Sequence, residues 1–333
     1  MSGRRFSCFF LPLLLILLSV PNGCNNSTAN LSGEGGKISA AGTASPSQYK
    51  SNPVIGATFL GPSEFPATIM KKMIDEAKRR DIKLYAYDGK DSVQEQIANI
   101  KDMVSKNVDV IILNPVDADA CIQCVELANA AGIPILGVNA MVNTEKLLTY
   151  VGSNDLEAGE IVMKHIAEMI EGKGEIVVLD GVRGQSSQLQ RTQGILNILR
   201  SYPNIRILEE KPGNWFREEG YNLMKSWYEK YGSKITAVVS QNDEMALGAI
   251  KYMEEKGIMG KFPIIGIDAI PDALKAVKEG KLDATVFQDA EGQAKMSLDL
   301  AVKIHNGESC AKTYFIPFRL VTRENIDQYL KNR

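Results

Sequence analysis

The sequence predicts an α/β protein made of two doubly wound lobes, and three observations support this fold class. From Pro53 onward, short runs of β-branched and apolar residues alternate with amphipathic stretches of helical spacing. Such alternation is typical of parallel strands that are covered by helices on both faces. The chain has 333 residues and eleven candidate strands, which is many for one sheet of this kind, so two sheets of five or six strands fit better.

The chain begins with a segment that predicts export. Arg4 and Arg5 precede the apolar run 6–20, which has the length of a signal peptide and is short for a membrane-spanning helix. We therefore assign residues 1–23 to a signal peptide.

The residues after this segment predict a lipid anchor and a tether. Gly23 stands directly before Cys24, and this pair resembles the cleavage site of bacterial lipoproteins, although Pro21 departs from the usual pattern. Lipid attachment at Cys24 is the expectation, and cleavage with plain secretion is the alternative. Residues 24–52 are rich in Asn, Ser, Gly, Ala and Thr, which predicts a flexible tether.

The remaining chain alternates strands and helices in a regular order. The predicted strands cover residues 54–60, 82–88, 108–114, 133–139, 149–153, 175–180, 205–210, 235–240, 263–268, 283–288 and 313–322. Amphipathic helices lie between most of them; the one over 91–106 opens with an Asp or Ser cap.

Composition and motifs argue against several classes of function. The net charge is −2 with no basic stripe, so no nucleic-acid partner is expected. The chain has two His residues, and it contains neither a GxSxG nucleophile motif nor a phosphate-binding loop, so we do not expect an enzyme. Cys121 and Cys124 have CxxC spacing but lie in a predicted helix without a second ligand pair, which favours buried side chains or a local disulfide. Neither a metal nor another cofactor is predicted.

Polar residues gather where the predicted strands end. In open α/β sheets, ligands bind beyond the carboxyl ends of the strands. Segments of this kind are 61–66, Asn139, 181–191, Trp215, 241–243, Asp268 and Gln288. Their amides, carboxylates, single Arg and aromatic rings suit a neutral polyhydroxylated ligand, whose hydroxyls need paired acceptors and donors and whose C–H faces pack on rings.

Each of these side chains also has a structural interpretation. Asp155 and Asp243 are read as helix N-caps. Phe65 and Trp215 could belong to the core, and Arg191 could form an ion pair on a helix surface.

Four segments carry a resemblance to a known family. QNDEMALGAI (241–250), residues 266–295, LNPVDADA (113–120) and PFRLVTREN (317–325) resemble bacterial periplasmic sugar-binding proteins of the ribose and glucose/galactose type. The resemblance runs from about Pro53 to the C-terminus. It implies a type I periplasmic binding protein fold, with two Rossmann-like lobes joined by a three-crossing hinge. By this analogy the N-terminal lobe is 53–153 plus 289–316, and the C-terminal lobe is 154–288 plus 317–333.

The resemblance also implies a ligand site and leaves the ligand partly open. The sugar-contacting positions carry over to Ser63, Phe65, Asn139, Gln185, Ser187, Arg191, Trp215, Asn242, Asp268 and Gln288. Asn139 and Trp215 look like the glucose/galactose binders, Gln288 looks like the ribose binders, and Gln185 and Ser187 differ from both. The calcium loop of some galactose binders is not visible in residues 171–181. An aldohexose is favoured, with an inositol-type cyclic polyol or a pentose as alternatives.

The expected function is capture of a monosaccharide without chemistry, for the permease of an ABC transporter. The protein is expected to be a monomer outside the cytoplasm, held at a membrane by its lipid. A sugar-sensing ectodomain for a receptor is the alternative. Within the stretch 241–243 we expect Asn242 to face the ligand, Asp243 to cap the next helix and Gln241 to be structural.

Overall fold

A computed structural model describes residues 52–330. The predicted signal peptide, nearly all of the tether and the predicted lipid site at Cys24 lie outside these residues. In chain order the elements are β1 (Val54–Phe59), α1 (Glu64–Arg79), β2 (Lys83–Asp88), α2 (Val93–Ser105), β3 (Val110–Leu113), α3 (Ile122–Ala130), β4 (Ile135–Val138), β5 (Thr149–Gly152), α4 (Asp155–Met169), β6 (Lys173–Asp180), α5 (Ser186–Leu199), β7 (Asn204–Pro212), α6 (Arg217–Tyr231), η1 (Gly232–Lys234), β8 (Ala237–Ser240), α7 (Asp243–Lys256), β9 (Ile264–Asp268), α8 (Pro271–Glu279), β10 (Ala284–Phe287), α9 (Ala290–His305), β11 (Thr313–Phe315), β12 (Arg319–Thr322) and α10 (Asp327–Leu330).

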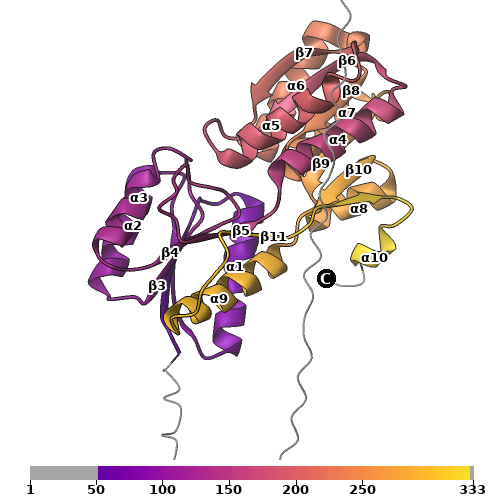
Figure 1. Cartoon of the computed structure of the whole chain (residues 1–333). Coiled ribbons are helices and arrows are strands. Elements are labelled where there is room, and N and C mark those ends of the chain that lie inside the picture. Colours follow the sequence, from indigo (N-terminus) through magenta and orange to yellow (C-terminus); the bar gives the residue numbers. More distant parts are fainter. Residues whose placement is uncertain (1–51, 331–333) are drawn as a thin grey trace, which may run out of the picture. The chain divides into compact units, whose positions relative to one another are not determined.

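These elements form two six-stranded sheets of the same design (Figure 1). The first sheet has the order β11-β5-β4-β3-β1-β2, and the second has the order β12-β10-β9-β8-β6-β7. Every neighbouring pair is parallel except β10 and β12. The predicted fold class, two doubly wound α/β lobes, is confirmed.

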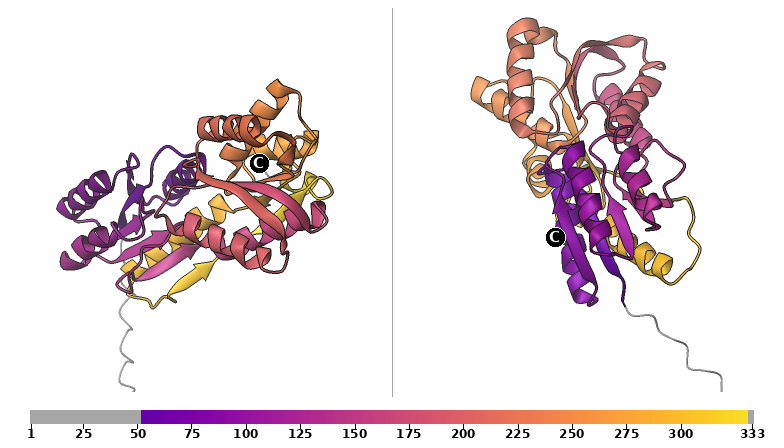
Figure 2. Two further views of the ribbon diagram at one scale, coloured as in Figure 1. Left: turned by 90° about the horizontal axis from the view of Figure 1, so that it is seen from above. Right: turned by 90° about the vertical axis from the view of Figure 1, so that its left-hand side faces the viewer.

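Helices cover both faces of each sheet because the strands are apolar on both faces (Figure 2). In β3, Val110 and Ile112 pack in one core cluster with α1 and α9, while Ile111 and Leu113 pack in another with α2 and α3. The second sheet follows the same rule, with α4 and α5 on one face and α6 and α7 on the other. The cap predicted for α2 is Ser92, whose hydroxyl accepts from Glu95 N at 3.3 Å.

The chain passes between the two sheets three times: after β5, after β10 and between β11 and β12. The prediction of one continuous strand over 313–322 is wrong, since β11 belongs to the first sheet and β12 to the second. Pro317 lies in the break, and because proline has no N–H to give to a ladder, it interrupts the strand where the chain changes sheets.

Two further features of the described residues concern membrane spans and strand direction. In the described stretch 52–330, no helix is both long enough and apolar enough to cross a membrane. All strands except β12 run parallel within their sheets, so the carboxyl ends of five or six strands in each sheet lie at one edge. The predicted ligand residues follow these ends.

Candidate functional site

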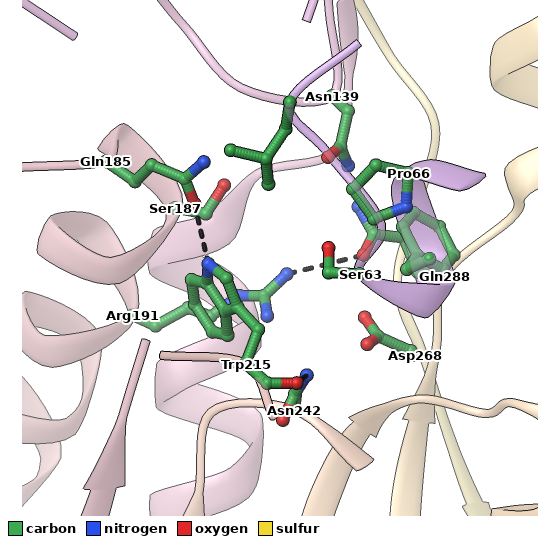
Figure 3. A pocket seen from close by; sticks show the side chains of 12 residues that line it. Ser63, Pro66, Asn139, Gln185, Ser187, Arg191, Trp215, Asn242, Asp268 and Gln288 are labelled. Carbon is green, nitrogen blue, oxygen red and sulfur yellow. Dashed lines mark hydrogen bonds between the residues drawn. The ribbon is translucent and has the colours of Figure 1, made fainter. Parts of the chain in front are cut away.

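A cleft at the strand ends collects residues from both sheets (Figure 3). Its empty volume is about 360 Å³, including the part that is open to solvent. Its lining consists of Leu60, Ser63, Phe65, Pro66, Asn139, Gln185, Ser187, Arg191, Trp215, Asn242, Asp268 and Gln288. The structure therefore brings all ten predicted ligand residues together. Leu60 and Pro66 were not predicted as ligand residues, because apolar residues after a strand carry no signal for a site.

Local structure explains how these side chains reach the cleft. Ser63 precedes α1 and Phe65 lies in its first turn, while Gln185 precedes α5. Asp268 is the last residue of β9, and Gln288 follows β10 directly. Three lining residues, Asn139, Trp215 and Asp268, have positive φ values of 65°, 70° and 120°. Non-glycine residues adopt such conformations rarely, and backbone strain of this kind concentrates at functional sites.

Arg191 lies inside the site and is held by three acceptors. Its Nε donates to Asp155 Oδ1 at 2.8 Å, its Nη1 to the backbone oxygen of Gln241, and its Nη2 to Gln288 Oε1 at 3.3 Å. Burial raises the pKa of Asp155, and the guanidinium of Arg191 opposes this shift. Three of the five N–H donors are thus engaged by the protein, which leaves two for a ligand.

The structure overturns two structural interpretations of this pair. Arg191 is 4% exposed, so it does not form a surface ion pair. The prediction that Asp155 is an N-cap is wrong, because Asn154 occupies the cap position and Asp155 is the first residue of α4. Its carboxylate points instead to Arg191, 36 residues further along the chain.

Trp215 is fixed in place by Gln185 and by a glycine. Its Nε1 donates to Gln185 Oε1 at 2.8 Å (Figure 3). The side-chain nitrogen of Gln185 donates to the backbone oxygen of Pro115 at 3.4 Å. A Cβ on Gly181 would lie 1.8 Å from the ring of Trp215, so only glycine fits beneath it. The guanidinium carbon of Arg191 lies 5.6 Å from the ring centroid, within cation–π range. Trp215 therefore belongs both to the core and to the cleft.

The stretch 241–243 divides its roles differently from the prediction. Asn242 is the N-cap of α7: its Oδ1 accepts from Met245 N at 3.0 Å, and its Nδ2 donates to the backbone oxygen of Trp215 at 3.1 Å. The prediction that Asp243 is the cap is therefore wrong. Asp243 is fully buried and accepts from Thr285 Oγ1 at 2.7 Å and from Ile270 N at 3.0 Å. Burial raises its pKa to about 7.

Asp268 and Gln288 carry the polar groups that are most available to a ligand. Asp268 is 5% exposed, and no hydrogen bond to its carboxyl oxygens is seen within residues 52–330. Burial raises the pKa of Asp268 well above its ordinary value; Arg191 opposes this shift, and Asp243 adds to it. The side-chain nitrogen of Gln288 is buried without a partner. A buried acceptor pair and a buried donor without partners are well suited to hydroxyl groups, which can satisfy both.

Other candidate groups do not form a second centre. Cys121 and Cys124 are free and buried, so the local disulfide is not formed, and Cys121 donates to Gln96 Oε1 at 3.2 Å. In the part of the chain that the structure covers, no three His, Cys, Asp or Glu side chains are grouped to hold a metal ion.

Known proteins include clear relatives of this chain. The family described as periplasmic binding protein domain matches residues 58–309. The xylitol-binding protein of Mycolicibacterium smegmatis is 34% identical over 87% of this chain and 83% of its own length. Two solved structures are similar: an ABC transporter solute-binding protein of Bacillus halodurans with bound myo-inositol (37% identity, TM-score 0.81, covering 85% of this chain and 98% of that one) and one of Actinobacillus succinogenes with bound D-allose (28%, 0.78, 84% and 100%).

The family match covers most of the chain, and its members are solute-binding components of transport, not enzymes. The expected class of protein is thereby confirmed. This chain belongs to the periplasmic binding protein family, in the branch of sugar-binding proteins that serve ABC transporters.

Proposed function

We propose that this protein captures one neutral cyclic polyol of the myo-inositol type in the cleft and delivers it to the permease of an ABC transporter. The observation that carries the proposal is that the carboxyl group of Asp268 and the side-chain nitrogen of Gln288 are buried without hydrogen-bond partners among the described residues. They lie beside Arg191, which keeps two of its five N–H donors for a ligand. Each hydroxyl of a polyol donates and accepts, so it can satisfy the carboxyl group of Asp268 and the donor-only amide nitrogen of Gln288. Phe65 and Trp215 would cover the C–H faces of the ring.

The choice of a cyclic polyol over the aldohexose favoured by the sequence rests on similarity. At 37% identity, the structure with bound myo-inositol is more similar to this chain than the one with bound D-allose at 28%. An aldohexose remains the second candidate, because Asn139 and Trp215 are of the type found in hexose binders and the two free N–H groups of Arg191 could serve a ring oxygen. A site with buried polar groups discriminates strongly between such ligands, since a missing hydroxyl leaves a partner unpaired.

A thermal-shift screen tests the proposal. A ligand that binds only the folded state raises the melting temperature. We expect the largest rise with myo-inositol, and smaller rises with xylitol, D-allose, D-glucose and D-ribose. A rise with D-glucose that exceeds the one with myo-inositol would favour the second candidate. No rise with any of the five compounds would contradict capture of a polyhydroxylated solute.

Export and anchoring complete the proposal. The N-terminal segment supports secretion and lipid attachment at Cys24, which would keep the binding domain close to its permease. We expect the full-length protein to fractionate with membranes and the Cys24→Ala variant to be released into the soluble extracytoplasmic fraction. Equal membrane association of both proteins would refute the anchor.

A further inference from the structure

Two fully buried amides occupy equivalent places in the two sheets. Asn114 is the first residue after β3, and Gln241 is the first residue after β8. β3 lies between β1 and β4, and β8 lies between β6 and β9, so both residues end the third strand from the same edge of their sheet. Neither residue lines the cleft. Asn114 forms hydrogen bonds with the cleft residues Leu60 and Asn139, and Gln241 directly precedes the cleft residue Asn242.

The amide of Asn114 joins the ends of three strands. Its Oδ1 accepts from Leu60 N, just beyond β1, at 3.1 Å. Its Nδ2 donates to the backbone oxygen of Val138 at 3.1 Å and to Asn139 Oδ1 at 3.4 Å. The bond to Asn139 engages one lone pair of that side chain's oxygen and so orients the amide, whose nitrogen is left to donate to a ligand.

Gln241 repeats this arrangement in the second sheet. Its Oε1 accepts from Gly181 N, just beyond β6, at 3.1 Å. Its Nε2 donates to Asp180 Oδ1 at 2.9 Å and to Thr192 Oγ1 at 2.8 Å, and its backbone oxygen accepts from Arg191. The side-chain oxygen and both amide hydrogens are thus occupied, as they are in Asn114, so neither side chain has a donor left for a ligand.

We infer that Asn114 and Gln241 are a matched pair of positioning residues, each of which holds the ligand-contacting side chains of its own half of the cleft. Asn114 acts through Leu60 and Asn139. The side chain of Gln241 acts through Gly181, which lies against the ring of Trp215, and the backbone oxygen of Gln241 accepts from Arg191. The sequence interpretation recognised Gln241 as structural but did not connect it with Asn114, because the pairing becomes visible only from the strand order of both sheets.

Calorimetric titration with myo-inositol tests the role of Asn114, and this part rests on the proposed function. We expect Asn114→Ala to raise Kd about tenfold, because a buried set of hydrogen bonds that orients Asn139 is lost. The matched control is Asn99→Ala, since Asn99 is also a buried amide and bonds Thr58 Oγ1 and the backbone oxygen of Asp88 but no cleft residue. It should lower the melting temperature similarly and leave Kd unchanged.

A double variant separates positioning from a general loss of stability. If Asn114 acts through Asn139, Asn114→Ala combined with Asn139→Ala should bind no more than about twofold worse than Asn139→Ala alone. Fully additive losses, or an equal loss of affinity in Asn99→Ala, would overturn the inference. If Asn114→Ala does not fold, Asn114→Ser, whose shorter side chain cannot reach all three partners, replaces it in the same cycle.

The role of Gln241 is tested without ligand, so this result does not depend on the proposed function. The chain has two Trp residues, Trp215 and Trp227, and replacing the fully buried Trp227 by Phe leaves the emission of Trp215 alone. In that background we expect Gln241→Ala to shift the emission maximum and increase quenching by iodide, and Asn114→Ala to change neither. Unchanged emission in Gln241→Ala would overturn the inference for the second sheet. A wild-type protein that fails to bind myo-inositol contradicts the proposed function alone.

Discussion

Gly181→Ala should impair the site through a single methyl group. The new Cβ would lie 1.8 Å from the ring of Trp215, whereas ordinary contacts begin at 3.4 Å, so the ring must move by about 1.6 Å. That movement breaks the 2.8 Å hydrogen bond to Gln185 in the free and the bound protein alike, which lowers stability, whereas the contact with a ligand ring face, worth about 1 kcal/mol, is lost only from the complex. The loss of about 1 kcal/mol from the complex predicts a Kd that rises about fivefold.

Calorimetry with the tightest ligand from the thermal-shift screen provides the assay, and circular dichroism verifies that the variant is folded. The control is the same substitution in a Trp215→Ala background, where the methyl group has no ring to displace and should change Kd less than twofold. A comparable loss in both backgrounds, or an unchanged Kd in Gly181→Ala alone, would refute the proposed contact between the ring and the ligand.

Three further predictions concern buried acids. Asp268→Asn should raise Kd at least tenfold, because the amide nitrogen cannot accept the ligand hydroxyl that a carboxyl oxygen accepts. The melting temperature of the ligand-free protein should not fall, since burial raises the pKa of Asp268 and so disfavours its charged form. A folded variant with wild-type affinity would exclude Asp268 from the site. Burial and the neighbouring Glu210 raise the pKa of Asp180 to about 8. The native state therefore holds a proton that the unfolded chain has lost between about pH 4 and pH 8, so this group makes stability fall as pH rises through that window. Urea titrations across this window should show a flatter dependence for Asp180→Asn, and an unchanged slope would contradict the shift. Asp155→Ala leaves the buried Arg191 without its carboxylate and should cost about 3 kcal/mol of unfolding free energy in urea titrations, against well under 1 kcal/mol if the pair were solvated.

The sequence was sufficient for the fold because the fold follows from strand positions, whereas the ten ligand residues were implied by the resemblance to sugar-binding proteins. Alternation of strands and helices located ten of the twelve strands within a few residues, and the carboxyl ends of those strands placed the candidate residues on one edge. The prediction of one strand over 313–322 failed because the residues on both sides of Pro317 are strand-like, and the sheet assignment shows that they pair in different sheets.

The roles of individual side chains could not be predicted in the same way. Whether Asn242 or Asp243 caps α7 depends on a shift of one residue, and periodicity does not resolve helix ends at that level. Asp155 was assigned to a cap because its partner Arg191 is distant in sequence. The same limit hid Asn114, whose bonds reach Leu60 and Asn139 through the neighbouring strands.

Isothermal titration calorimetry of the soluble domain with myo-inositol tests the central claim most directly. Capture in a single cleft predicts saturable heat with one site per chain. It also predicts a Kd at least tenfold lower than that for a deoxy analogue that lacks one ring hydroxyl, because the analogue leaves a buried polar group of the protein without a hydrogen-bond partner. Absence of saturable heat with myo-inositol, or equal affinity for the deoxy analogue, would contradict the account of the site.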